Sequence, residues 1–191
     1  MGIDLDDVKV ARNELGLWLG WAGATAIGMM LGYLPAALLV NILNLDLGLA
    51  RVLVPLLAGL LVGLAQWLVL RNYMTRSQDW ILAGGAGWAV GYALGLMIVQ
   101  ALSGSPLGTW AGYVLFGALI GLVQWPVLRR EVPNAVLWVI ASLVGWTIGF
   151  LISSLVLNAL FAGAQADLAL ISVVDSGLSG LIAGAITGLA L

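Results

Sequence analysis

Residues 59–71 read GLLVGLAQWLVLR, and residues 117–129 read GALIGLVQWPVLR. In each copy, two glycines lie four positions apart in an apolar run that ends in a Gln-Trp pair and an arginine. With the chain shifted by 58 residues, 14 of 33 positions are identical between 59–91 and 117–149. The repeated unit is therefore longer than one apolar run, because the identities resume in the next apolar segment, whereas no position from 72 to 79 matches its counterpart.

Weaker copies of this frame lie at both ends of the chain. Gly20-Trp21 resembles Gly87-Trp88 and Gly145-Trp146, and Gly180, Gly184 and Thr187 fall where Gly117, Gly121 and Gln124 stand. We therefore predict three tandem helical hairpins, approximately at 16–70, 80–128 and 136–191. Such hairpins insert in the same direction, unlike the inverted repeats of many secondary transporters.

The composition excludes most soluble classes of protein. Of 191 residues, 62% are hydrophobic and 8% are charged, against roughly 45–50% and about 25% in a typical soluble domain. The mean hydropathy is +1.10. A net charge of −2 offers no basic face for nucleic acid. Cysteine and histidine are both absent, which excludes disulfides, thiolate chemistry, structural zinc and imidazole acid–base catalysis.

Six apolar segments are long enough to cross a bilayer, which takes about 20 residues of helix. They run approximately over 16–40, 52–70, 80–102, 108–128, 136–160 and 169–191. Their residues do not alternate between apolar and polar, so barrel strands are not expected. We predict an all-α polytopic membrane protein with one six-helix domain at 16–191. The acidic segment 1–15 lacks the basic start of a signal peptide and is predicted to be a cytoplasmic tail.

The basic residues predict the orientation in the membrane. If the N-terminal tail is cytoplasmic, six of the seven basic residues lie on that side, and Arg51 alone lies on the other. The six are Lys9, Arg12, Arg71, Arg76, Arg129 and Arg130. Because cytoplasmic loops are enriched in Lys and Arg, we predict that both termini are cytoplasmic.

The repeated frame also carries a family resemblance. The Gln-Trp…Arg runs, the segment WILAGGAGWAVG at 80–91 and the closing GAITGLAL at 184–191 resemble small multi-pass proteins predicted in cyanobacteria and Chloroflexi. That family has no assigned activity. The resemblance implies a bacterial cytoplasmic (inner) membrane setting.

Polar residues near the ends of the repeated runs are the first candidates for a site. Gln66 and Gln124 lie five residues before Arg71 and Arg129, or about 7.5 Å of helix rise. Indole rings favour that depth, so we predict four interfacial anchors: Trp67, Trp80, Trp125 and Trp138. In the alternative interpretation, Gln66, Gln124 and Thr187 converge on the pseudo-threefold axis and line a site. Arg71 and Arg129 would then hold an anionic headgroup.

Asp175 is the one acidic residue inside a predicted span. An intramembrane carboxylate is costly and is by default a functional candidate. Two structural alternatives remain open. Asp175 can cap a shorter final helix that begins at Ser176, or it can pair with Arg51 on the same side of the membrane.

The residue inventory argues against catalysis. A serine nucleophile has no histidine base, an aspartyl dyad lacks its second carboxylate, and no metal cluster can be assembled. We therefore expect no enzyme, no cofactor and no metal.

The leading hypothesis is a scaffold or accessory subunit. Its glycine-lined helices would pack with other membrane subunits, or with a second copy, within the lipid bilayer. The alternative is a small-molecule or lipid-binding transport component. Chain length, six spans and the Ala22/Ala26 pair resemble the substrate-binding subunits of energy-coupling-factor transporters. A channel around the pseudo-threefold axis is a third hypothesis, but no ring of charge marks a filter.

Overall fold

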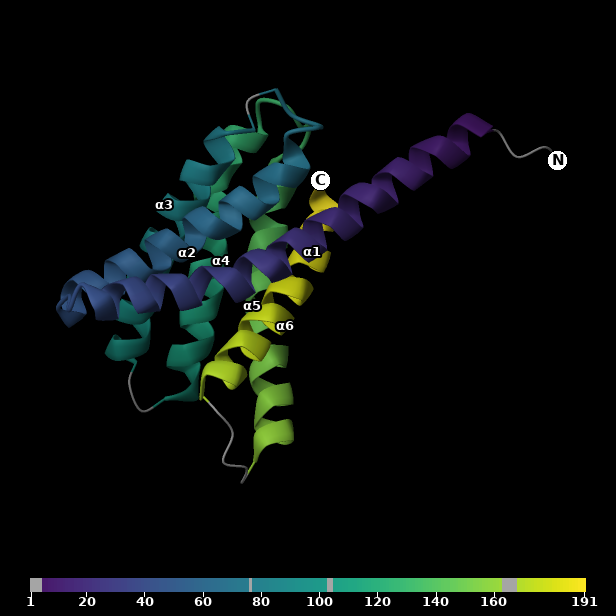
Figure 1. Cartoon of the computed structure of the whole chain (residues 1–191). Coiled ribbons are helices and arrows are strands. Elements are labelled where there is room, and N and C mark those ends of the chain that lie inside the picture. The colour runs from purple at the N-terminus through teal and green to yellow at the C-terminus, as the bar shows by residue number, and fades with distance from the viewer. Residues whose placement is uncertain (1–4, 76, 103–104, 163–167) are drawn as a thin grey trace.

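The structure, a computed structural model, describes residues 5–75, 77–102, 105–162 and 168–191, and it is all-helical there. Six long helices follow one another, and a short 3₁₀ turn, η1, ends the chain (Figure 1). Their bounds are α1 Leu5–Ile42, α2 Leu47–Leu70, α3 Asp79–Ala101, α4 Pro106–Leu128, α5 Val136–Phe161, α6 Leu168–Thr187 and η1 Gly188–Ala190. By length and composition, all six helices can cross a membrane. The predicted all-α class with six membrane-spanning helices is confirmed at this level.

Two helices begin five or more residues before their predicted starts. The first helix begins at Leu5, so part of the predicted tail at 1–15 continues α1, which projects beyond the other helices (Figure 1). The second helix begins at Leu47 and not near Val52. The cause is Asp46, whose side chain accepts hydrogen bonds from the backbone N–H groups of residues 48 and 49 at 2.8 and 3.1 Å. This N-cap satisfies donors that the first turn leaves free.

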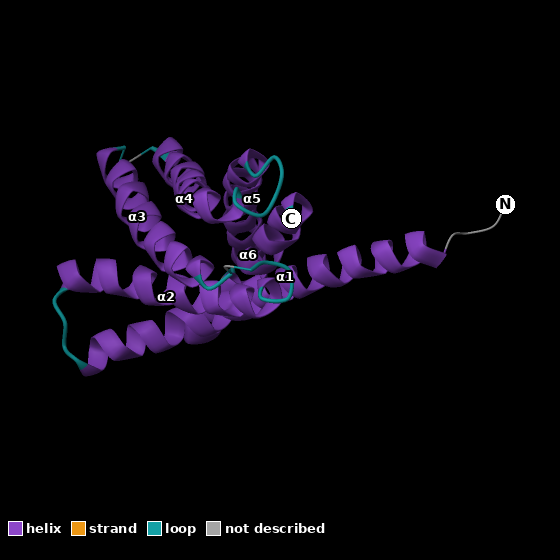
Figure 2. Ribbon diagram, turned by 90° about the horizontal axis from the view of Figure 1, so that it is seen from above, coloured by secondary structure: helices purple, strands orange, loops and turns teal. Residues whose placement is uncertain are grey.

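The six helices form a closed ring. Among the described residues, each helix contacts the helices before and after it in the chain, and α6 contacts α1. By backbone distance, no other pair of the six helices is adjacent in these ranges, although side chains of α1, α3 and α5 meet in the interior. The order of the helices can be followed from above in Figure 2.

Glycines allow neighbouring helices to approach backbone to backbone. A Cβ atom added at Gly28 of α1 would lie 2.9 Å from the Cα atom of Val62 in α2. In the same way, one at Gly87 of α3 would lie 3.3 Å from the Cα atom of Ile120 in α4, and one at Gly145 of α5 would lie 3.1 Å from the carbonyl oxygen of Ala183 in α6. Helices gain little hydrophobic energy from one another in lipid, so such close contact is a main source of their association.

The inside of the ring is filled by two layers of side chains, each with contributions from all six helices or their ends. The tryptophan cluster consists of Trp21, Trp80 and Trp138. The second aromatic layer consists of Trp88, Phe116 and Trp146. The tryptophan cluster packs against Ala190 and Leu191 at the C-terminal end of the chain.

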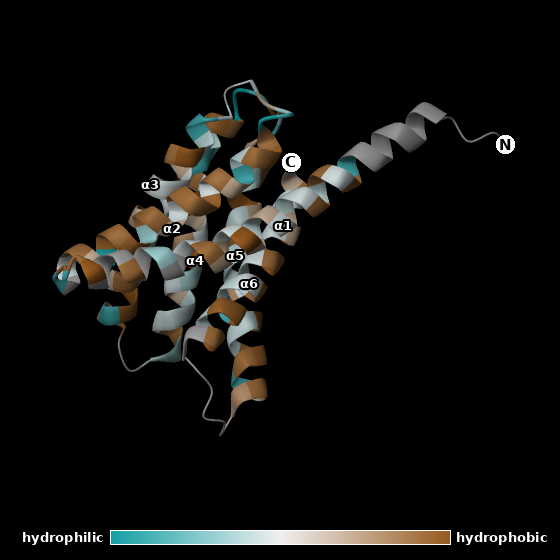
Figure 3. Cartoon of the chain, in the orientation of Figure 1, coloured by the Kyte–Doolittle hydropathy of each residue, from teal (hydrophilic) through white to brown (hydrophobic). Residues whose placement is uncertain are grey.

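The outer face of the ring is apolar. Leu82, Leu155 and Met97 are each more than half exposed, as expected for side chains that face lipid. Hydrophilic residues gather in the connections at 71–79 and 129–135 (Figure 3). We call this end of the ring, which also holds the C-terminus, the arginine end. The other end, where the α1–α2, α3–α4 and α5–α6 connections lie, is the opposite end.

Candidate functional site

The tryptophan cluster fills the inside of the ring near the arginine end. The ring centroids of Trp21 and Trp80 lie 5.6 Å apart, those of Trp21 and Trp138 5.5 Å, and those of Trp80 and Trp138 5.2 Å. All three pairs are edge-to-face, the arrangement that aromatic quadrupoles favour. The three indoles are at most 2% exposed.

Each indole of the cluster has a polar partner on a neighbouring helix. Trp80 donates its N–H to Gln66 at 2.9 Å, and Trp138 donates to Gln124 at 3.1 Å. Trp21 donates to Thr187 at 2.9 Å, across the contact that closes the ring. A buried N–H needs such an acceptor. The three acceptors thus hold the indoles in place.

This geometry differs from both sequence interpretations of the polar residues. Gln66, Gln124 and Thr187 are at most 4% exposed, and their described bonds go to protein partners. They surround packed indoles and do not line an open site. They also lie inside the ring, away from the lipid headgroups.

The four predicted anchors divide into two pairs. Trp80 and Trp138 belong to the core, which corrects their prediction as interfacial anchors; their Gln partners draw them into the ring. Trp67 and Trp125 are partly exposed at the arginine end. The guanidinium carbons of Arg71 and Arg129 lie 5.7 and 4.9 Å from their ring centroids, within the range of a cation–π contact.

The position of Trp21 changes the register of the first repeat. The sequence alignment matched Trp21 with Trp88 and Trp146. Those two residues instead contact each other in the second aromatic layer, with centroids 5.3 Å apart. Trp21 contacts Trp80 and Trp138, so it corresponds to them in space. Trp21 is therefore displaced by about two helical turns from the predicted repeat alignment.

Asp175 lies inside α6, which begins at Leu168. The alternative in which it caps a helix beginning at Ser176 is wrong, because the apolar residues before it continue the helix. The alternative pair with Arg51 is not formed: both residues are described, and the ion pair found among the described residues joins Arg130 and Asp79. The carboxylate instead accepts a hydrogen bond from the hydroxyl of Ser153 on α5.

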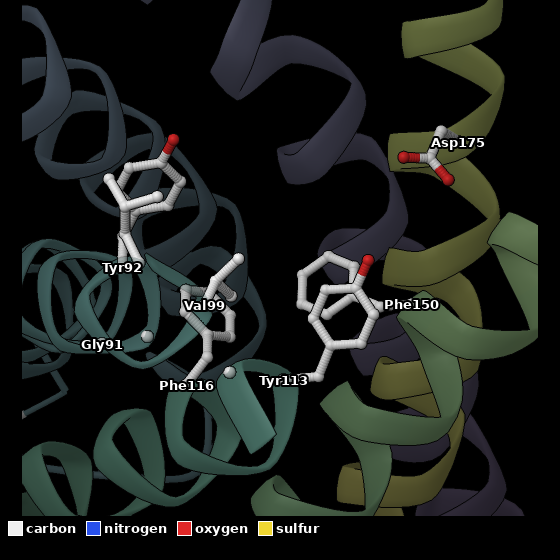
Figure 4. Close-up of a pocket in the computed structure, with 10 residues that line it drawn as sticks. Gly91, Tyr92, Val99, Tyr113, Phe116, Phe150 and Asp175 are labelled. Carbon is white, nitrogen blue, oxygen red and sulfur yellow. The ribbon is translucent and has the colours of Figure 1, made fainter. Parts of the chain in front are cut away.

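Asp175 is one wall residue of a cavity that we call the aromatic cavity. Its volume is about 260 Å³. It is lined by Gly91, Tyr92, Gly95, Leu96 and Val99 of α3, Gly112, Tyr113 and Phe116 of α4, Phe150 of α5, and Asp175 of α6. Figure 4 shows the two tyrosines, the two phenylalanines and Asp175 around this space.

On the side toward the arginine end, the aromatic cavity is bounded by packed side chains. Phe116 belongs both to its wall and to the second aromatic layer. Its ring centroid lies 5.2 Å from that of Trp88 and 5.9 Å from that of Trp146. Two filled layers thus lie between the cavity and the arginine end. This arrangement suits a one-sided pocket better than a channel along the axis.

Sequence reasoning missed the aromatic walls of this cavity. Tyr92, Tyr113, Phe116 and Phe150 were not singled out, because a scattered aromatic residue in an apolar span carries no signal by itself. One signal was present. Gly91-Tyr92 and Gly149-Phe150 are separated by the same 58 residues as the repeated frame.

Within the described residues, no three Asp, Glu, His or Cys side chains are placed to hold a metal ion. Comparison with protein-family models, with curated proteins and with solved structures gives no match to this chain. The described residues thus hold two internal features: a packed tryptophan cluster, and a cavity with one carboxylate in its wall.

Proposed function

We propose that this chain is a non-enzymatic integral membrane protein that binds a small molecule or a lipid headgroup in the aromatic cavity, as a component of a membrane transport system. The observation that carries the proposal is the cavity, with four aromatic side chains and the carboxylate of Asp175. Apolar walls with a few polar groups are the usual form of a small-molecule site. The Asp175–Ser153 pair holds no histidine, cysteine or lysine that could complete a catalytic set.

A scaffold or accessory role has less support. It requires a glycine-lined face that is free for another subunit or a second copy, and the last helix carries such glycines at 180 and 184. A Cβ atom at Gly180 would lie 2.7 Å from Met29 of α1, and one at Gly184 would lie 2.9 Å from Ala22. These glycines are used to close the ring of this chain.

We also propose an origin by duplication and an orientation in the membrane. We infer three duplicated hairpins, supported by the equivalent contacts of Gly28, Gly87 and Gly145 with the following helix. We also infer that the arginine end is cytoplasmic, with both termini on that side, because it gathers Arg71, Arg129 and Arg130. The aromatic cavity would then lie in the outer half of a bacterial inner membrane.

Single-cysteine labelling tests the proposed function, because the chain has no cysteine of its own. Leu96→Cys places a thiol in the cavity wall, and Leu94→Cys places one on the exposed side of the same helix. In lipid nanodiscs, neutral methyl methanethiosulfonate should modify the thiol of Leu96→Cys at least about tenfold faster than the thiol of Leu94→Cys. The apolar surroundings of residue 94 suppress formation of the reactive thiolate. Equal rates at the two positions would overturn the proposal.

A further inference from the structure

The charged residues on the helices that line the aromatic cavity are acidic. The four helices that line the cavity are α3 to α6. They contain two charged residues, Asp79 and Asp175, and both are acidic. No lysine or arginine follows Arg130 in the chain.

The remaining helix that packs on α6 does not supply a cation either. On α1, the basic residues are Lys9 and Arg12, and the acidic Glu14 follows them. All three precede Trp21, which packs beside Thr187 near the arginine end. Asp175 lies 12 residues before Thr187, or about 18 Å along the helix. Arg51 is exposed on α2, which does not line the cavity. Among the described residues, the hydrogen-bond partner of the Asp175 carboxylate is the Ser153 hydroxyl, so a cation in the cavity would balance its charge.

The cavity walls are suited to a positive charge. The ring centroids of Tyr113 and Phe150 lie 5.1 Å apart with their planes tilted by 30°, and those of Phe116 and Phe150 lie 5.4 Å apart. Tyr92 completes the aromatic lining from α3 (Figure 4). Aromatic faces attract cations, most strongly where water is excluded.

The lining has few polar groups, which favours a cation that needs few hydrogen bonds. Besides Asp175, the lining side chains with a polar atom are the phenols of Tyr92 and Tyr113. A primary ammonium brings three N–H donors that need acceptors. A quaternary ammonium brings none, and its methyl groups pack on aromatic rings. Its charge is nonetheless balanced by one carboxylate.

We propose that the aromatic cavity is a binding site for a small quaternary ammonium group, with Asp175 as its counter-ion and Tyr92, Tyr113, Phe116 and Phe150 as its cage. This inference rests on the proposed function and names the ligand class. The volume of about 260 Å³ is below the usual range of drug-sized pockets, so the site takes a compact headgroup. Anions are excluded by the same carboxylate.

The charge preference is tested with two reagents on the Leu96→Cys protein in nanodiscs. One is the trimethylammonium-ethyl methanethiosulfonate, and the other is the sulfonate-ethyl analogue. Relative to their rates with free cysteine, the cationic reagent should react at least about tenfold faster than the anionic one. Asp175→Asn should abolish this preference, whereas Asp79→Asn, which removes an acidic group at the arginine end, should retain it.

Protection of the Leu96→Cys thiol by a reversibly bound cation gives a second test. Tetramethylammonium chloride should slow the neutral reaction at Leu96→Cys by about tenfold at saturation, and sodium chloride at equal ionic strength should not. Phe150→Leu should weaken this protection. Size-exclusion chromatography and tryptophan fluorescence establish that each variant is folded.

The outcomes separate the two proposals. Fast neutral labelling of Leu96→Cys without cation preference, or a preference that survives Asp175→Asn, overturns the quaternary ammonium site and leaves a cavity for another small molecule. Equal neutral labelling of Leu96→Cys and Leu94→Cys overturns the proposed function itself.

Discussion

Trp80 donates its indole N–H to the Oε1 atom of Gln66 at 2.9 Å. The amide nitrogen of Gln66 donates in turn to the hydroxyl of Thr25 at 3.0 Å. One glutamine of α2 therefore connects α3 to α1 in the interior of the ring. A polar side chain in that position stabilises the ring only while both partners are present, because an unpaired buried donor carries its full desolvation cost.

The first prediction concerns this bond. Gln66→Leu should lower the free energy of unfolding by about 1–3 kcal/mol, because it leaves the indole N–H of Trp80 without an acceptor. Reversible denaturation in mixed micelles, followed by tryptophan fluorescence, measures the change. Adding Trp80→Phe removes the donor as well, so the double variant should lose less stability than the sum of the two single variants. Additive losses would contradict the bond as described.

The second prediction compares two glycines. A Cβ atom at Gly117 of α4 would lie 2.7 Å from the carbonyl oxygen of Ser142 on α5. Gly117→Ala should therefore push the two backbones apart and cost about 1–3 kcal/mol. A Cβ atom at Gly23 of α1 meets nothing within 4 Å, so Gly23→Ala should be neutral or stabilising by up to about 1 kcal/mol. Thermal unfolding of both variants in the same detergent measures the two changes in stability. A loss for Gly117→Ala but not for Gly23→Ala would show that the close approach of the two helices at Gly117 causes it.

The six helices could be predicted from the sequence because each one forms from the residues of its own apolar run. Each run of about 20 apolar residues forms a helix in lipid regardless of its neighbours. The late prediction of the start of α2 also has a local cause, because Asp46 caps this helix before the apolar run begins. The last helix begins at Leu168, one residue from its predicted start at 169.

The site could not be predicted in the same way, because its contacts join helices that are distant in sequence. Trp80 and Trp67 look alike in the linear pattern, since each lies near an arginine at a helix end. The first is buried and the second is partly exposed; the first donates a hydrogen bond to Gln66 on the neighbouring helix. The aromatic cavity likewise needs side chains from four helices, and helical periodicity does not state which faces meet.

The third prediction concerns the surface of the arginine end. Arg130 and Asp79 form an ion pair at 2.9 Å between the α4–α5 connection and the start of α3, and both side chains are nearly half exposed. Exposed pairs contribute little, so Arg130→Gln should change the free energy of unfolding by less than about 1 kcal/mol. The same measurement in high salt should reduce the difference further. A loss as large as that of Gln66→Leu would mean that this pair supports the ring.

The last prediction tests which side of the membrane the arginine end faces. Asn72 lies in the α2–α3 connection, and Leu43 follows α1 at the opposite end; both are exposed. Since the chain has no cysteine, Asn72→Cys and Leu43→Cys each report one side through a membrane-impermeant maleimide. With three arginines at 71, 129 and 130, the positive-inside preference places Asn72 in the cytoplasm. In intact bacterial cells, Leu43→Cys should therefore be labelled and Asn72→Cys should be labelled only after the membrane is opened. The reverse pattern would place the aromatic cavity in the cytoplasmic half, and a cationic ligand would then have to reach it from inside the cell.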